Sequence, residues 1–188
     1  MELRKLNRQQ ICDLYEFSLR CDFPPSELKS LSAILNMYER GRYDVLGAYE
    51  QDTLVAYALL YRPENEREIL LDYLAVLPQY RGQHIGTMLL TQLRSYYAPV
   101  CDVLMIECER PLAAPDEAEA RRRIHFYTFA GAKLTSVRVW LFGVEYSILI
   151  LPCREEIPSC NWAEKILFMY RQMLPPDLYE HNVRMIRK

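Results

Sequence analysis

Apolar and polar residues alternate in short segments along the first third of the chain. Segments at Glu2–Leu6, Asp44–Tyr49 and Thr53–Tyr61 are rich in residues that favour strands. The polar turn Glu50-Gln51-Asp52 separates the second and third segments, which predicts a hairpin. The stretch Glu68–Val76 is nearly continuously apolar, which predicts a central buried strand.

Segments whose apolar residues recur at helical spacing lie between these predicted strands. Residues from Gln9 to about Leu19 place apolar side chains on one helical face, and Phe23-Pro24-Pro25 ends this helix. A second helix is expected to start at Ser26, a good N-cap residue. A third predicted helix follows Gly86 and runs to about Tyr97.

The second half of the chain repeats this alternation. Val103–Cys108 predicts a strand, and Asp116 predicts the N-cap of a helix that ends before Gly131. Ser136–Leu141 and Val144–Leu151 predict a second hairpin, and an amphipathic helix is expected near 162–174. The order β-α-α-β-β-β-α-β-α-β-β-α indicates an α/β domain with a mixed, largely antiparallel sheet.

Length and composition fit one domain with an appended element. Hydrophobic residues make up 51% of the 188 residues, which is enough to bury a core. We expect a domain over residues 1–151 and a C-terminal helical extension over 152–188, packed on the domain or on a partner subunit. The sequence therefore leaves open whether the protein forms a homodimer.

Charge and cysteine use exclude several classes of protein. The net charge of −2 argues against nucleic acid as a partner, and no apolar stretch is long enough to span a membrane. The N-terminus does not resemble a signal peptide. The six cysteines form no CxxC pair, so we expect no metal and free thiols in a cytoplasmic protein.

The stretch LDYLAVLPQYRGQHIGTMLL, residues 71–90, carries the most specific chemistry. A buried strand runs into a loop with Gly82 and Gly86 and then into a helix. Glycines let the backbone approach a ligand closely, and a helix N-terminus attracts negative charge. The segment therefore predicts a site for a pyrophosphate.

Three kinds of phosphate loop contain glycines between a strand and a helix. A P-loop needs a lysine after the second glycine, and a dinucleotide-binding fingerprint needs a third glycine; the segment has neither. It closely resembles the pyrophosphate loop of the GNAT N-acetyltransferase superfamily, with Leu74-Ala75-Val76, Pro78, Arg81-Gly82 and Gly86 in place. His84 stands where the family has its first motif glycine, which is tolerable if the backbone there is right-handed.

A second block of the sequence resembles the late helix of the same family. In residues 123–132 a Phe-Tyr pair precedes Gly131, and Tyr127 matches the tyrosine that acts as general acid in many members. The alternative is that Tyr127 fills the apolar stripe of its helix.

The resemblance implies acetyl-CoA as donor and co-substrate. Its pantetheine would pair with the backbone of Leu74 and Val76, and the Leu74 N–H would polarise the acetyl carbonyl. The residues expected to bind the donor are Leu74, Ala75, Val76, Arg81, Gly82, Gln83, His84, Ile85, Gly86 and Thr87.

Direct attack on a thioester needs a neutral amine and hence a base. Asp72, Glu107 and Glu109 are candidates, and we expect Asp72 to share a strand face with Leu74 and Val76. For each carboxylate the alternative is an ion pair. We therefore expect an N-acetyltransferase acting on a primary amine, with Tyr127, Asp72 and Glu107 as catalytic residues. A non-catalytic acyl-CoA-binding module is the alternative.

Overall fold

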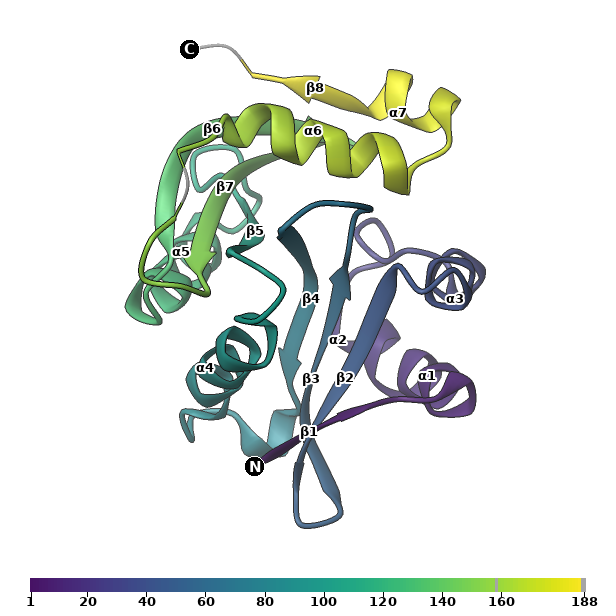
Figure 1. Cartoon of the computed structure of the whole chain (residues 1–188). Coiled ribbons are helices and arrows are strands. Elements are labelled where there is room, and N and C mark those ends of the chain that lie inside the picture. The colour runs from purple at the N-terminus through teal and green to yellow at the C-terminus, as the bar shows by residue number, and fades with distance from the viewer. Residues whose placement is uncertain (158, 187–188) are drawn as a thin grey trace. The chain divides into compact units, whose positions relative to one another are not determined.

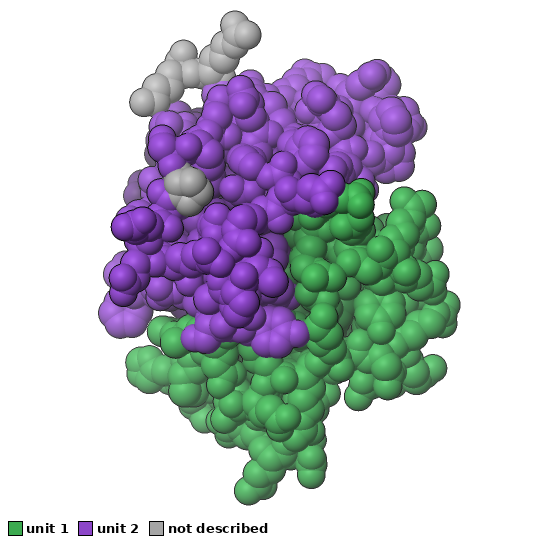
Figure 2. Space-filling view, viewed as in Figure 1, with its two compact units in different colours: residues 1–64, 71–92 green, residues 65–70, 93–188 purple. Residues whose placement is uncertain are grey.

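The computed structural model describes residues 1–157 and 159–186 of the chain (Figure 1). It divides into two compact units, shown in different colours in Figure 2. Unit 1 comprises residues 1–64 and 71–92, and unit 2 comprises residues 65–70 and 93–188. Within the described ranges, no helix combines the length and the apolar character that crossing a bilayer requires.

The strands of unit 1 follow the predicted pattern closely. Strand β1 (Glu2–Lys5) pairs antiparallel with β2 (Tyr43–Glu50), and β2 pairs antiparallel with β3 (Thr53–Tyr61). Strand β4 (Glu68–Val76) is next to β3 and has the predicted bounds. In the β2–β3 turn Gln51 takes a φ of 56°, the left-handed conformation that a glycine would adopt more easily.

The first helix is longer than its apolar pattern indicated. Helix α1 (Arg8–Leu14) continues through a π-helical turn, η1 (Tyr15–Leu19), into α2 (Arg20–Asp22). Asn7 caps its N-terminus. The side chains of Ile11, Leu14 and Leu19 are buried on its inner face. The extended backbone of Phe23 ends the helix, as predicted from the prolines that follow.

The second helix starts later than predicted. Helix α3 (Leu31–Glu39) has Ser30 as its N-cap, whose hydroxyl accepts from the N–H of Ala33 at 3.2 Å. The predicted start at Ser26 is wrong, because residues 24–28 form a turn in which the Pro24 carbonyl accepts from Glu27 and Leu28. Both serines are good caps, and tertiary contacts of this segment decide between them.

After β4 a short 3-10 turn, η2 (Pro78–Tyr80), leads into α4 (Ile85–Tyr97), as the glycine-containing loop predicted. Strand β5 (Val103–Glu109) follows in unit 2. Helix α5 (Glu117–Phe129) begins at Asp116, whose carboxylate accepts from the N–H of Glu119 at 2.9 Å. It ends before Gly131, which has a φ of 98°.

The sheet of unit 2 contains β5 and the predicted second hairpin. Strands β6 (Lys133–Leu141) and β7 (Val144–Pro152) pair antiparallel, and β7 also pairs antiparallel with β5. Phe142 and Gly143 both have positive φ in the turn, which suits the twist of a two-residue hairpin. The predicted α/β class with a largely antiparallel sheet is confirmed.

The C-terminal segment adds a strand that the apolar pattern did not indicate. Helix α6 (Trp162–Met173) is close to the predicted range, and α7 (Pro176–Asn182) starts at the second of the two prolines. Strand β8 (Val183–Met185) then pairs antiparallel with β6. Three residues are too short a segment for an alternating pattern to stand out.

Candidate functional site

Buried and half-buried residues alternate along the second half of strand β4. Leu71, Tyr73 and Ala75 are buried, whereas Asp72, Leu74 and Val76 are half-buried. The expectation that Asp72 shares a face with Leu74 and Val76 is therefore met. The predicted base therefore shares its strand face with the side chain of Leu74, the residue whose N–H is the predicted oxyanion donor.

The loop after β4 turns through two left-handed residues. Gly82 has a φ of 76° and His84 a φ of 59°. The condition under which a histidine fits easily, a right-handed backbone at His84, is not met: this position has the left-handed conformation that favours glycine, and the histidine bears the strain. The His84 carbonyl accepts from the N–H of Met88 at 3.0 Å, so this residue starts α4.

The loop surface leaves its backbone accessible. An added Cβ at Gly82 would meet no atom within 4 Å. Gly82, Gln83 and His84 are exposed, while Ile85 and Gly86 are buried and Thr87 is half-buried at the start of α4. The first N–H groups of a helix have no partner within it and carry partial positive charge. The arrangement can hold an anionic group without a charged side chain.

Arg81 ties the loop to two other segments of unit 1. Its Nε donates to the Val76 carbonyl at 3.0 Å, and its Nη2 pairs with the buried Asp22 carboxylate at 2.8 Å. Asp22 also accepts from the Tyr57 hydroxyl at 2.8 Å, and burial together with this bond raises the pKa of Tyr57. Arg81 thus fixes the loop at the end of β4.

Asp72 is engaged by two residues that the sequence did not single out. Its carboxylate pairs with Lys29 Nζ at 2.8 Å and accepts from the Tyr43 hydroxyl. The Asp72 side chain is 3% exposed and that of Lys29 24% exposed. The Lys29 ammonium also lies 5.2 Å from the ring centroid of Tyr73, within cation–π range. Carboxylate, hydroxyl and ring together form an ammonium site filled by Lys29.

The backbone around Lys29 is fixed by the same strand. The Tyr73 hydroxyl accepts from the N–H of Lys29 at 2.9 Å and donates to the Glu27 carbonyl at 2.8 Å. These contacts hold the segment before α3 in its turn. A buried carboxylate predicts a cationic partner, but nothing local in the sequence says which of the basic residues it is.

Glu107, the second predicted base, belongs to unit 2. It is half-buried on β5 and accepts from the hydroxyl of Tyr170 in α6. Glu109, on the same face, lies 3.8 Å from Arg123. The C-terminal helix therefore contributes a direct partner to a candidate catalytic carboxylate, and no sequence motif had indicated Tyr170.

Tyr127 is half-buried on α5, also in unit 2. An ordinary phenol is protonated at neutral pH, and burial raises the pKa of the Tyr127 hydroxyl further, so the group holds the proton that a general acid needs. Burial also raises the pKa of the neighbouring Cys108 thiol to about 12. Cys108 is thus a poor nucleophile near neutral pH.

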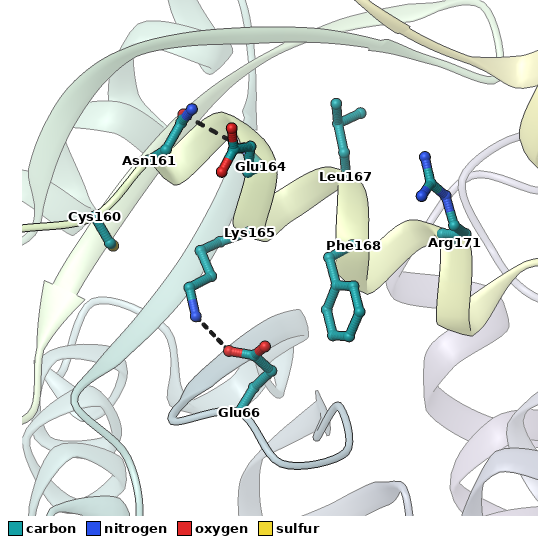
Figure 3. A pocket seen from close by; sticks show the side chains of 8 residues that line it. All are labelled: Glu66, Cys160, Asn161, Glu164, Lys165, Leu167, Phe168 and Arg171. Carbon is teal, nitrogen blue, oxygen red and sulfur yellow. Dashed lines mark hydrogen bonds and ion pairs between the residues drawn. The ribbon is translucent and has the colours of Figure 1, made fainter.

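A pocket of about 460 Å³ opens beside α6 within unit 2 (Figure 3). Lys165 reaches across it to Glu66 and also pairs with Glu68 at 3.0 Å. Acidic and basic side chains both line it, so its charge favours no one class of ligand. Its lining residues are Glu66, Cys160, Asn161, Glu164, Lys165, Leu167, Phe168 and Arg171.

Metal ligands do not gather in either unit. Across residues 1–157 and 159–186, no three His, Cys, Asp or Glu side chains are placed to hold a metal ion together. The described residues supply backbone N–H groups at a loop, an ammonium site, two candidate carboxylates and a protonated phenol.

A family model described as the acetyltransferase (GNAT) family matches residues 8–128, more than half of the chain. No curated protein matches the sequence. The matched range contains β4, the glycine loop and Tyr127, but not α6 with Tyr170.

Solved structures agree with this match. A protein assigned to the GNAT family from Bacteroides thetaiotaomicron is 19% identical with a TM-score of 0.70, covering 88% of this chain and 93% of its own. The ribosomal-protein-S18-alanine N-acetyltransferase of Escherichia coli is 19% identical with a TM-score of 0.62, and the match covers 85% of this chain and 98% of its own. YncA of Salmonella typhimurium, solved with its cofactor acetyl-CoA, is 16% identical with a TM-score of 0.60, and the match covers 85% of this chain and 98% of its own. At sequence identities this low, the structural similarity shows a shared fold.

We expect His84→Gly to raise the free energy of unfolding by about 1 kcal/mol, because glycine adopts positive φ without strain. Urea denaturation measures the change. Thr91→Gly, inside α4, is the matched control and should lower stability by a similar amount. Equal destabilisation by the two substitutions would contradict the strained conformation at His84.

We expect Lys29→Ala to lower stability by about 3 kcal/mol, because the Asp72 carboxylate is left without its cation. Added propylamine should restore part of the melting temperature by filling the ammonium site. Tetramethylammonium, which has no N–H donor, should not. Lys5→Ala, whose lysine pairs with the buried Asp44 at 3.0 Å, is the matched control. Equal rescue of both variants would show that propylamine acts nonspecifically.

Proposed function

The chain belongs to the acetyltransferase (GNAT) family, and from this premise we propose that it acetylates a primary amine by direct attack in a ternary complex. Family membership makes acetyl-CoA the donor. The observation that carries the proposal is the loop from Leu77 to Gly86, with open backbone at Gly82 and the start of α4 behind it.

The donor is proposed to bind mainly through backbone groups. The pyrophosphate would accept from N–H groups between Gly82 and Thr87, where the helix terminus adds positive potential. Arg81 supports this loop from beneath through Val76 and Asp22. Leu74 and Val76 would pair with the pantetheine, and the Leu74 N–H would stabilise the developing oxyanion.

The acceptor is proposed to be a primary amine because unit 1 already contains an ammonium site. Lys29 fills the site formed by Asp72, Tyr43 and Tyr73. An acceptor ammonium has the same charge and the same donors as the Lys29 head group. Partial exposure of Lys29 leaves it room to move, and its release would give Asp72 to the acceptor for recognition and proton transfer.

Glu107 is proposed as a second proton acceptor, acting through water. Tyr170 donates to its carboxylate, which leaves further lone pairs on the two oxygens. The amine loses one proton before attack, because the ammonium form has no lone pair and a lysine-like amine has a pKa near 10. Tyr127 is proposed to protonate the thiolate of CoA as the C–S bond breaks.

The alternative is an acyl-CoA-binding module without turnover. One observation favours it: both candidate bases, Asp72 and Glu107, are bonded to other side chains. Thiol release from acetyl-CoA across an amine panel separates the two proposals, since a module binds the donor but releases no CoA. The cytoplasmic location and the homodimer stay predictions.

We expect acetyl-CoA to raise the melting temperature, since it binds the folded state only; at 100 times its dissociation constant the effect is about 2.7 kcal/mol. Gly82→Val should abolish most of this shift by blocking approach to the backbone. Gly41→Val is the matched control, because Gly41 has a φ of 68° and equally open surroundings. No shift for the wild type at millimolar acetyl-CoA would refute donor binding.

We expect Tyr127→Phe to lower the turnover number about 10²-fold, with little change in acetyl-CoA affinity, because the ring stays and the proton donor is lost. Burial raises the pKa of Tyr127, so the wild-type rate should fall on the alkaline side only above the ordinary phenol value of about 10. Thiol-release kinetics against pH measure both effects. Wild-type turnover in a folded variant would assign Tyr127 to the core.

A further inference from the structure

Unit 2 brings two of the six cysteines together at the ends of neighbouring strands. Cys101 lies just before β5 and Cys153 just after β7, and these strands pair with Val103 opposite Pro152. The N–H of Cys153 donates to the Asp102 carbonyl at 2.8 Å, which continues the ladder by one step. Asp102 thus lies opposite Cys153, and Cys101 is its diagonal neighbour across the strand pair, although 52 positions separate the two cysteines in the sequence.

The surrounding backbone and side chains hold this juxtaposition in place. The N–H of Cys101 donates to the Tyr97 carbonyl at 2.8 Å, and its thiol donates to the Val103 carbonyl at 3.0 Å. Asp102, between the strands' ends, pairs with Arg67 at 2.9 Å and Arg154 at 3.3 Å. Both cysteine positions are fixed before any oxidant arrives.

The two thiols differ in the way that a disulfide-forming pair requires. Their mutual hydrogen bond, followed by burial, raises the pKa of Cys101. The same bond and the nearby Arg94 guanidinium lower the pKa of Cys153. Arg94 Nε donates to the Pro152 carbonyl at 2.7 Å, which keeps this cation next to Cys153. Cys153 is partly exposed and Cys101 fully buried, so Cys153 is the thiol that reacts first.

We propose that Cys101 and Cys153 form a reversible disulfide when the protein meets a hydroperoxide. The Cys153 thiolate attacks the peroxide oxygen, takes up one oxygen atom as a sulfenic acid, and releases an alcohol or, from hydrogen peroxide, water. The Cys101 sulfur then attacks the Cys153 sulfur, and the hydroxyl leaves as water with the Cys101 proton. Two thiols are oxidised and one peroxide is reduced.

The other four cysteines make different environments and serve as internal references. Cys108 is buried, with a pKa raised by that burial to about 12. Cys21 is exposed, and Cys12 and Cys160 are half-buried.

The test treats the reduced full-length protein with hydrogen peroxide, blocks remaining thiols with N-ethylmaleimide and maps tryptic peptides by mass spectrometry. We expect a loss of about 2 Da before blocking, from the two hydrogens removed, and four blocked thiols instead of the six that the sequence contains. Cys101 and Cys108 share one tryptic peptide, so fragmentation of the linked peptides should place the bond between Cys101 and Cys153 and the N-ethylmaleimide on Cys108. Dithiothreitol should restore six blocked thiols.

Single variants separate the two roles. In Cys101→Ser we expect the Cys153 sulfenic acid to persist and to be trapped by dimedone, without a disulfide. In Cys153→Ser the buried Cys101 should stay reduced, and Cys21→Ser should form the disulfide as the wild type does. The proposal is overturned if another pair of peptides is linked, or if the wild type keeps both thiols at a peroxide dose that oxidises the exposed Cys21. Both of these outcomes are measured on the peptide map of the wild-type protein, so the test does not depend on whether a variant folds.

Discussion

A carboxylate inside strand β4 sets the constraint on which much of unit 1 depends. Burying an unpaired charge costs several kcal/mol, so Asp72 needs a cation and a donor close by. Lys29 and Tyr43 supply them, and Tyr73 on the same strand fixes the backbone of the Lys29 segment. These contacts hold the segment just before α3, whose N-cap is Ser30 and not Ser26.

The far end of β4 obeys a related constraint. Arg81 joins the Val76 carbonyl to Asp22, the last residue of α2, and Asp22 also accepts from Tyr57. The loop that turns into α4 is thus held by side-chain bonds on its inner side. This support lets the outer backbone remain open at Gly82 and lets His84 keep a left-handed conformation that its own side chain disfavours.

The sequence pattern predicted those features that depend on residues close together in the chain. The bounds of β4 and α4, and the caps at Asp116 and Gly131, depend on spacing and on residue chemistry within a few positions. The Lys29–Asp72 and Tyr170–Glu107 contacts join residues 43 and 63 positions apart, and no periodicity encodes such pairs. The backbone at His84 could not be predicted either, because the supporting Arg81 contacts are tertiary.

The two candidate bases raise the same mechanistic question in each unit. The motif residues proposed to bind the donor would do so through backbone groups, which many side chains allow. Each carboxylate, in contrast, is partnered by a residue outside the motif: Lys29 before it, and Tyr170 beyond the family match. A partner that donates to a carboxylate stabilises its charged form and weakens it as a base. Departure of the partner would therefore strengthen the base, and in the proposed mechanism a cationic acceptor brings this about at Asp72 by replacing Lys29. Tyr170 is a neutral donor that a cation does not replace, so under this proposal the acceptor acts on the availability of Asp72 and not on that of Glu107.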